Sequence, residues 1–360
     1  MSGYGQQQVG GRRRTDAGDH AGARPAPRRR RLHRALIGLG LTLAVLVPLG
    51  LAAGWYLTDR YAGNLERVSA FEGLDESRRP PAPPPAPAGK APLTMLVVGS
   101  DTRADVPDGA LPDGRSDVMM LVRVTGDRSN AQVVSLPRDS WVSIPGVGPA
   151  KLNAAYAHGG PSLLIDTVET LTGARIDHYA AIDFAGFVQM TDALGGVDVA
   201  VAETTTSGPY TYSAGPNHLD GQQALQYVRQ RHGLPGGDFD RVKRQQQYLR
   251  SVFTALSQQA VLSDMGALDG FLMALTDAMT VDETLTSPAL LGLAYDLRGL
   301  RPDALTFLTA PVAGTGTEGA QSVVYLDPAR AELLWSYLRS DSLQAHAAEF
   351  GLDTLPAVPN

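Results

Sequence analysis

The chain has 360 residues, enough for one large domain or two domains of ordinary size. Its formal net charge of −6 is unevenly distributed, because residues 1–34 hold nine arginines against two aspartates and the remainder therefore carries about −13. The absence of cysteine excludes disulfide bonds, thiolate metal sites and cysteine nucleophiles.

The first 58 residues predict a disordered basic cytoplasmic tail followed by a transmembrane helix. Residues 1–34 are rich in Gln, Gly, Pro and Arg and hold few apolar side chains that could be buried. Residues 35–58 carry no charge and, at about 1.5 Å per residue, can cross a hydrocarbon layer of roughly 30 Å as a helix. This length favours an uncleaved anchor over a signal peptide cut near Ala52.

The arginines of residues 1–34 precede this apolar stretch and are best explained as a topology signal. They predict a single-pass protein of the cell membrane, with a cytoplasmic N-terminus and an extracellular C-terminal part. A contact with anionic lipid heads is expected, rather than one with nucleic acid.

Residues 59–92 are expected to connect the anchor to a folded domain. The composition of residues 61–77 indicates a short charged helical stalk. Residues 80–87, PPAPPPAP, predict a semi-rigid extended spacer. The alternative, a polyproline ligand for a recognition domain, does not suit an extracellular position.

From residue 93 onwards, apolar runs alternate with helical patterns. Strands are expected at 93–98, 118–124, 132–136, 179–183, 197–201, 305–308 and 323–326. Helices are expected at 153–158, 162–171, 184–194, 221–229, 240–258 and 328–339, with two more within 263–297. The alternation predicts an α/β fold, in which helices flank a central mixed sheet. We expect one domain over residues 93–340 and a C-terminal tail over residues 341–360.

Charged side chains gather where these strands end. Asp101 follows the first strand, and Arg115 and Asp117 stand where the second begins. Arg138 follows the third strand, and Lys151 opens the next helix. Strand ends are the usual ligand sites of α/β proteins, and paired carboxylates suit Mg²⁺. Each residue alone could form an ordinary salt bridge, but together they predict a site for a Mg²⁺-bound polyphosphate or pyrophosphate.

A second basic cluster lies further along the chain. Arg229 and Arg231 are two residues apart, so in an extended segment their side chains point the same way. A glycine-rich break at 233–237 follows, and Arg241 and Gln245 then share one face of the next helix. These four side chains could converge on one anion, and planar guanidinium groups suit phosphate.

The same stretch allows a plainer interpretation, a solvated charged helix. Lys243 and Arg244 do not share the face of Arg241 and Gln245 and are expected to be surface charges. His232 is expected to be structural, because it has no evident oriented partner and neighbouring arginines disfavour its imidazolium form.

Several motifs, in this order, resemble the LytR–CpsA–Psr family, in its actinobacterial form. They are VVGSDTR, RSDVMMLV, VVSLPRDSWVSIPG, KLNAAYAHGG, TVETLTG, IDHYAAIDFAGF, DALGGVDV, GQQALQYVRQRH and DRVKRQQ. The resemblance runs from about residue 93 to residue 257. Small departures are Val118, where the family usually has threonine, and Leu152, where isoleucine is usual.

This resemblance implies a membrane-anchored phosphotransferase of cell wall assembly in Gram-positive bacteria. Such an enzyme moves a glycopolymer, for example a wall teichoic acid, a capsule or arabinogalactan, from polyprenyl pyrophosphate to peptidoglycan. The acceptor would be the 6-hydroxyl of N-acetylmuramic acid. The implied partners are the polyprenyl-pyrophosphate-linked glycopolymer, peptidoglycan and the membrane, and no nucleic acid.

The resemblance also assigns residues to roles. Asp101 and Asp117 would be the ligands of Mg²⁺, or of Mn²⁺. The implied pyrophosphate contacts are Arg115, Arg138, Lys151, Arg229, Arg231, Arg241 and Gln245. The implied catalytic residues among them are Arg115, Arg138, Arg229 and Arg231. The polyprenyl tail is expected in an apolar tunnel with candidate walls at 162–171, 184–190 and 252–256, and ordinary core packing is the alternative for each.

Three functions remain open from the sequence. Phosphoryl transfer needs an in-line acceptor and neutralised phosphate charge, which arginines and Mg²⁺ supply. The base for the acceptor hydroxyl is open among Asp101, Asp117 and Asp139. If water replaced the sugar hydroxyl, the same site would be a polyprenyl-pyrophosphate hydrolase. The third possibility is a non-enzymatic envelope regulator or lipid-binding protein whose arginine tail acts on nucleic acid.

Overall fold

The computed structural model describes residues 60, 65–86, 89–100, 116–257, 265–351 and 353–360. All of them belong to one compact unit, Tyr56–Asn360. The expected tail and transmembrane helix at 1–58 lie outside the described residues, as do Asp101 and Arg115. Among the helices that are described, none is both long and apolar enough to cross a membrane.

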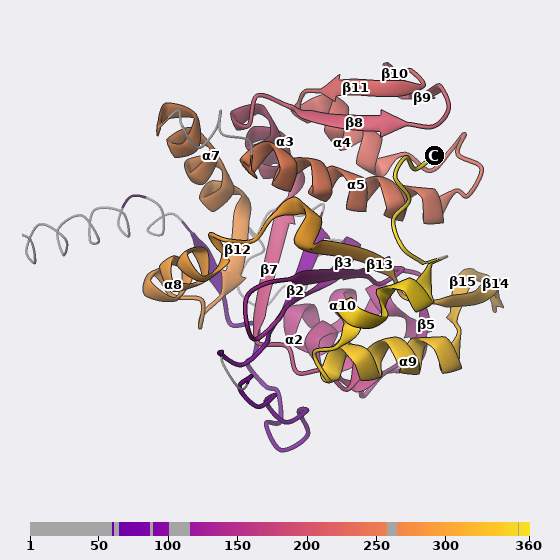
Figure 1. Ribbon diagram of the computed structural model, residues 1–360. Helices are drawn as coiled ribbons and strands as arrows, with labels where there is room; N and C mark the ends of the chain where they lie inside the picture. Colours follow the sequence, from indigo (N-terminus) through magenta and orange to yellow (C-terminus); the bar gives the residue numbers. More distant parts are fainter. Residues whose placement is uncertain (1–59, 61–64, 87–88, 101–115, 258–264, 352) are drawn as a thin grey trace, which may run out of the picture. The chain divides into compact units, whose positions relative to one another are not determined.

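A seven-stranded mixed sheet forms the centre of this unit, in the order β1-β12-β7-β2-β3-β4-β13 (Figure 1). Its strands are β1 (Glu66–Val68), β2 (Leu93–Ser100), β3 (Ser116–Val124), β4 (Ala131–Ser135), β7 (His178–Asp183), β12 (Met279–Asp282) and β13 (Leu305–Thr309). Parallel pairs join β2 to β7, β4 to β13 and β1 to β12, and the remaining pairs are antiparallel. The α/β class and the mixed sheet are confirmed.

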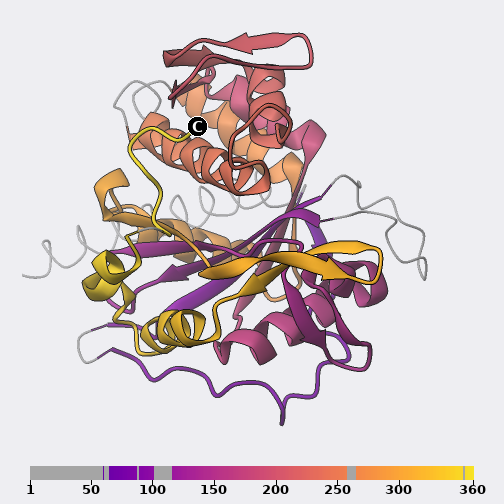
Figure 2. The same ribbon diagram turned by 90° about the vertical axis from the view of Figure 1, so that its right-hand side faces the viewer.

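Helices cover both faces of the sheet. The helices described are α2 (Leu152–Thr172), α3 (Phe184–Ala193), α4 (Gly221–Arg229), α5 (Asp238–Ser257), α7 (Met265–Ala278), α8 (Ser287–Leu297), α9 (Pro328–Arg339) and α10 (Leu343–His346). In Figure 2, α2 and α9 lie on one side of the sheet and α5 lies on the other.

The two faces of the sheet differ in how they are filled. Successive side chains of a strand point to opposite faces. Leu96 and Val98 of β2 are fully buried in the main core, together with Leu164 of α2 and Leu334 of α9. Val97, between them, lines a cavity on the side of α5. The cavity therefore lies at the ends of the central strands, on the side of α5.

The helices α3, α4 and α7 extend this second face, together with small two-stranded sheets. These are β8 (Val197–Val201) with β11 (Gly215–Leu219), and β9 (Thr205–Ser207) with β10 (Tyr210–Tyr212). The helix α4 begins with a capping box, in which Asp220 and Gln223 bond to each other's backbone N–H groups. Gly186 lets α3 approach α7 closely, because a Cβ there would lie 2.2 Å from the Cβ of Ala278.

Sequence patterns missed or misplaced several elements. The helical stalk expected at 61–77 is wrong, because residues 66–68 form β1 and the residues after them form turns. The two helices expected at 153–171 form one element, α2, with non-helical backbone at Gly159 and Gly160. The strands that were missed include β5 (Trp141–Ile144), which pairs with β6 (Gly148–Lys151), and β12, which lies between β1 and β7. The strand expected at 323–326 is present as β15 (Gln321–Leu326), and its partner β14 (Val312–Glu318) was missed.

Segments on both sides of the expected 93–340 domain pack against it. Arg79 forms three hydrogen bonds with Glu169 of α2, of 2.8, 3.0 and 3.3 Å, and its guanidinium also donates to the carbonyl of Ile176. At the other end of the chain, Phe350 is buried in the main core. The backbone N–H of Leu355 donates to the carbonyl of Phe307 in β13.

The ion pair between Arg79 and Glu169 is predicted to hold residues 65–86 on the domain. Glu169 is 2% exposed and also accepts a 2.8 Å hydrogen bond from the N–H of Ile176, so Glu169→Ala leaves a buried arginine without its charge partner. We expect a loss of about 3–5 kcal/mol in the free energy of unfolding. Urea unfolding of the full-length chain in detergent measures it.

The matched control is Glu332→Ala, because the pair of Glu332 with Arg339 is exposed. Its expected effect is below about 1 kcal/mol. Equal effects of the two substitutions would contradict the stabilising role assigned to the Arg79 contact.

Candidate functional site

A cavity of about 170 Å³ lies between the second face of the sheet and helices α3, α4 and α5. Engineered apolar cavities of about 150 Å³ bind molecules of the size of benzene, so this space exceeds what a single water molecule needs. The apolar lining consists of Val97, Val98, Gly99, Val118, Met120, Ile182, Phe184, Phe187, Met190, Leu225, Val228, Tyr248 and Leu249. The polar lining consists of Asp117, Asp183, Arg229, Arg231, Arg241 and Gln245.

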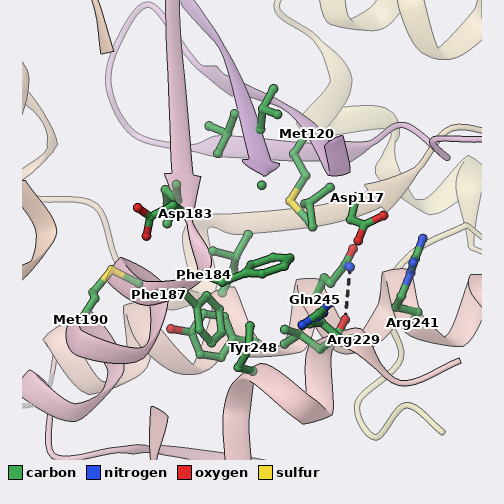
Figure 3. Close-up of a pocket in the computed structure, with 18 of the residues that line it drawn as sticks. Asp117, Met120, Asp183, Phe184, Phe187, Met190, Arg229, Arg241, Gln245 and Tyr248 are labelled. Carbon is green, nitrogen blue, oxygen red and sulfur yellow. Dashed lines mark hydrogen bonds between the residues drawn. The ribbon is translucent and has the colours of Figure 1, made fainter. Parts of the chain in front are cut away.

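The arginines lie at one end of this cavity, and a stacked aromatic pair lies at the other. Figure 3 shows Asp117, Arg229, Arg241 and Gln245 at one end. Phe187, Met190 and Tyr248 lie at the other end. The rings of Phe187 and Tyr248 stack with centroids 4.4 Å apart. The site therefore presents a cationic end and an apolar, aromatic end.

Arg229 and Arg231 reach the cavity because the chain between them is extended. The helix α4 ends at Arg229, and Gln230 adopts φ −63° and ψ 131°. This confirms that the two arginines point toward the same space. The Arg229 guanidinium lies 4.3 Å from the centroid of the Phe184 ring, a cation–π contact. Within the described residues, neither arginine forms an ion pair with a carboxylate.

Arg241 and Gln245 line the same cavity from α5, as their spacing predicts. Arg241 is buried, and its Nη2 lies 2.8 Å from Oδ1 of Asp238. Its Nε has no hydrogen-bond partner among the described residues. Burial lowers the pKa of the Arg241 guanidinium, and the positive charges of Arg138 and Arg231 act in the same direction. A positive group that is buried and crowded by like charge favours an anion beside it.

Arg138, Lys151 and Asp117 form one network with Asp139 beside the cavity. Arg138 donates to Asp117, and its Nε lies 3.6 Å from Oδ2 of Asp139. Lys151, the last residue of β6, lies 3.1 Å from Oδ1 of Asp139. The structure thus joins three of the residues predicted from separate strand ends. Because Asp139 contacts two cations, it is a weak candidate for the base of the acceptor hydroxyl.

Asp183 is a cavity residue that sequence reasoning missed. Its Oδ1 accepts a hydrogen bond of 2.6 Å from the N–H of Gly186 and caps α3. Its place, after an apolar strand and before a helical pattern, was the available signal. One pair of sequence predictions, Asp101 and Arg115, is not placed because both lie outside the described residues.

The three candidate wall segments have different outcomes. Phe184, Phe187 and Met190 line the cavity, as expected for 184–190. Residues 162–171 contribute instead to the main core on the opposite face, where Leu164 is fully buried. Residues 252–256 are not among the lining residues, and Val252 packs into the core between the helices and β8. Tyr248 and Leu249, one turn earlier on α5, take their place.

Arg244 corrects another prediction, because it is fully buried rather than a surface charge. The side chain of Lys243 is 34% exposed and pairs with Asp240 at 3.2 Å. His232 is exposed and does not line the cavity. The helix α5 therefore buries cations on more than one of its faces, which i, i+4 spacing alone does not reveal.

Among the described residues, no group of three or more His, Asp or Glu side chains is arranged to hold a metal ion. Asp117 offers a carboxylate at the cationic end of the cavity. Mg²⁺ commonly takes only one or two protein carboxylates and completes its shell with water and phosphate oxygens. A single described carboxylate beside a cationic pocket is compatible with that chemistry.

This chain is similar to a known protein family and to several of its members. The family model "LytR_cpsA_psr family" matches residues 65–339. The cell wall biosynthesis protein LcpA of Corynebacterium glutamicum is 34% identical over 278 residues, covering 65% of this chain and 53% of LcpA. The polyisoprenyl-teichoic acid–peptidoglycan teichoic acid transferase TagU of Enterococcus faecalis is 36% identical over 208 residues, covering 57% of this chain and 66% of TagU.

A solved structure supports the same relationship. The crystal structure of TagV from B. subtilis matches with a TM-score of 0.58 and 25% identity, over 70% of this chain and 97% of that chain. The chain spans about half the length of LcpA and about two thirds of that of TagU. Because the family model spans the sheet, the cavity and every described site residue, the chain belongs to the LytR_cpsA_psr family.

Proposed function

We propose that this chain is a phosphotransferase of cell wall assembly. It would move a glycopolymer from a polyprenyl pyrophosphate carrier to a hydroxyl of N-acetylmuramic acid in peptidoglycan. The observation that carries the proposal is one cavity with arginines at one end and an apolar, aromatic lining at the other. The name of the relative TagU, a transferase of teichoic acid to peptidoglycan, supports it.

The cationic end suits a pyrophosphate. Arg229 and Arg231 have no carboxylate partner among the described residues, and Arg241 keeps an unused Nε. Gln245 joins them from α5, and Arg138 and Lys151 adjoin through Asp117 and Asp139. Guanidinium groups held in place before the reaction stabilise charge on the phosphate oxygens without reorganising. Arg115, which precedes β3 in the sequence and lies outside the described residues, is proposed to complete this set.

Asp117 and Asp101 are proposed to hold Mg²⁺ or Mn²⁺. Asp117 contacts Arg138 at the cationic end of the cavity, and its carboxylate would be one of the groups that hold the ion. When bound, a divalent ion neutralises phosphate oxygens and stabilises the departing polyprenyl phosphate. The arginines then orient the phosphate for in-line attack by the sugar hydroxyl, with no covalent intermediate on the protein.

The apolar end suits the polyprenyl tail. Phe184, Phe187 and Tyr248 offer rings, and Met190 adds a flexible apolar side chain. We also propose that residues 35–58 anchor the domain at the outer face of the cell membrane, where a lipid carrier presents its head group.

Loss of Arg229 is predicted to abolish transfer without unfolding the chain. Arg229→Ala removes one of the guanidinium groups that face the phosphates, which lowers the rate of transfer roughly 100- to 1,000-fold. The assay is transfer from a lipid-linked glycopolymer to peptidoglycan oligomers by the full-length protein in detergent with Mg²⁺. Arg298→Ala is the matched control, since Arg298 is also exposed and also stacks on a ring, that of Tyr295.

The same assay separates a transferase from a hydrolase. Omission of the peptidoglycan oligomer is expected to leave the lipid-linked substrate intact. Release of the glycopolymer phosphate at an equal rate without acceptor would support the hydrolase instead. Full activity of Arg229→Ala would refute both enzymatic functions at this site.

Removal of divalent cations is predicted to stop the transfer. EDTA abolishes activity, and excess Mg²⁺ or Mn²⁺ restores it, because phosphate charge is otherwise incompletely neutralised. Asp117→Asn is expected to raise the Mg²⁺ concentration for half-maximal rate roughly tenfold or more. Asp198→Asn, an exposed aspartate paired with His218, is the control. Activity that persists in EDTA would exclude the metal.

Filling the cavity is predicted to weaken binding of the lipid alone. Val97→Trp places a large ring in the cavity from β2. Affinity for geranylgeranyl pyrophosphate should fall roughly tenfold through lost apolar burial, while affinity for inorganic pyrophosphate stays unchanged. Calorimetric titration measures both. Val147→Trp, at an exposed valine, is the control, and equal losses for both ligands would contradict a lipid-binding cavity.

A further inference from the structure

Arg244 is a fully buried arginine for which the proposed reaction has no direct use. It lies on α5 between Arg241 and Gln245 in sequence but does not line the cavity. No ion pair with a carboxylate is found for it among the described residues. Burial of a guanidinium opposes folding, so the contacts that Arg244 makes must offset the loss of its hydration.

Groups of three other residues contact the Arg244 guanidinium. Its Nη1 donates to Oε1 of Gln230 at 2.7 Å, and its Nε donates to the backbone oxygen of Asn360 at 2.7 Å. The guanidinium also lies 4.4 Å from the centroid of the Tyr227 ring. These contacts join α5 to the end of α4 and to the C-terminal segment, which runs beside α5 in Figure 2.

Gln230 is the residue between the two arginines that face the cavity. It is 4% exposed, and its Nε2 donates to Oγ1 of Thr205 at 2.6 Å and to the carbonyl of His232 at 3.0 Å. Its Oε1 accepts from Arg244. With the Gln230 side chain fixed inward, the extended backbone directs Arg229 and Arg231 to the cavity.

We propose that Arg244 is a positioning residue, which acts through Gln230 to hold Arg229 and Arg231 in the geometry that binds a pyrophosphate. This inference rests on the proposed function. Arg244 differs from the arginines of the cavity because its effect on the ligand is indirect. Its loss should therefore weaken binding of the charged head group and leave binding of the apolar tail unchanged.

The test compares two ligands that share one lipid tail. Geranylgeranyl pyrophosphate and uncharged geranylgeraniol are titrated into the full-length protein in detergent with Mg²⁺. Arg244→Met is expected to weaken binding of the pyrophosphate about tenfold, a size typical of coupling within one hydrogen-bond network. Binding of geranylgeraniol should stay within about twofold of the wild type.

Arg123→Met is the matched control. Arg123 is also buried, on β3, and donates to Oγ1 of Thr94, far along the strand from Asp117. Burial lowers the pKa of both guanidinium groups. We expect Arg123→Met to lower the melting temperature without altering the affinity for either ligand. Such a result separates positioning from general destabilisation.

A double-mutant cycle with Gln230→Met tests the route of the effect. If Arg244 acts through Gln230, the double variant binds pyrophosphate no more weakly than the weaker single variant. Should Arg244→Met fail to fold, Arg244→Lys replaces it in the cycle. Lysine cannot reach Gln230 and Asn360 with one planar group, so its effect should be intermediate.

The outcomes distinguish this inference from the proposed function. Wild-type affinity for geranylgeranyl pyrophosphate in Arg244→Met, or in Arg244→Lys and Gln230→Met, overturns the positioning role. Equal losses for the charged and uncharged lipids overturn it as well. If the wild-type protein binds both lipids equally, the proposed function fails first, since there is no pyrophosphate site to position.

Discussion

The gathering of several cations around one cavity, two of them without a carboxylate partner among the described residues, is the constraint on which this site depends. Arg229, Arg231 and Arg241 converge from two helices, and only Arg241 has a carboxylate partner among the described residues. Like charges at such proximity oppose folding, and burial increases the opposition. The surrounding structure compensates with aromatic faces, as at Phe184, and with a rigid helix pair. Arg229 and Arg231 thus stand outside the ion-pair network that Arg138 and Lys151 form with Asp117 and Asp139.

The sheet makes this arrangement possible by treating its two faces differently. Leu96 is fully buried in the main core, together with residues of α2 and α9. Val97 and Met120 point the other way, where α3 and α5 stand over the strand ends and leave a space. Because successive side chains of a strand point to opposite faces, Leu96 enters the main core and Val97 faces the cavity. Because Gly186 brings α3 close to α7, the aromatic wall is fixed by backbone packing.

The sequence predicted those parts of the fold and site that depend on local pattern. The bounds of α4 match the expected 221–229, and the spacing of Arg241 and Gln245 placed both on the cavity face. What failed depends on partners distant in sequence. Strand β1 is three residues long and exists through its pairing with residues near Thr280. No local pattern in residues 61–77 carries that information.

Arg244 is buried, although helical spacing predicts a surface charge, because the residues it contacts are distant in sequence. Its partners, Gln230 and Asn360, lie 14 and 116 residues away, and helical spacing cannot reveal either contact. The walls of the cavity could not be predicted from the sequence for a similar reason. The apolar residues of α2 and α3 have similar patterns, and only tertiary packing places those of α2 in the core and those of α3 in the cavity. Local periodicity reports that a helix face is buried, and it does not report what lies opposite that face.

A bound anion would link the charge of the arginines at the cavity to the free energy of unfolding of the domain. Burial lowers the pKa of the Arg241 guanidinium, and the charges of Arg138 and Arg231 act in the same direction, against those of Asp238 and Asp117. A bound pyrophosphate would turn that repulsion into attraction, and any ligand that binds only the folded state adds to its stability. Repulsion between these arginines lowers the free energy of unfolding, and a bound anion would raise it again. Arg229 and Arg231 are exposed, whereas Arg241 is buried, so an anion bound at the cationic end would compensate chiefly the buried charge of Arg241.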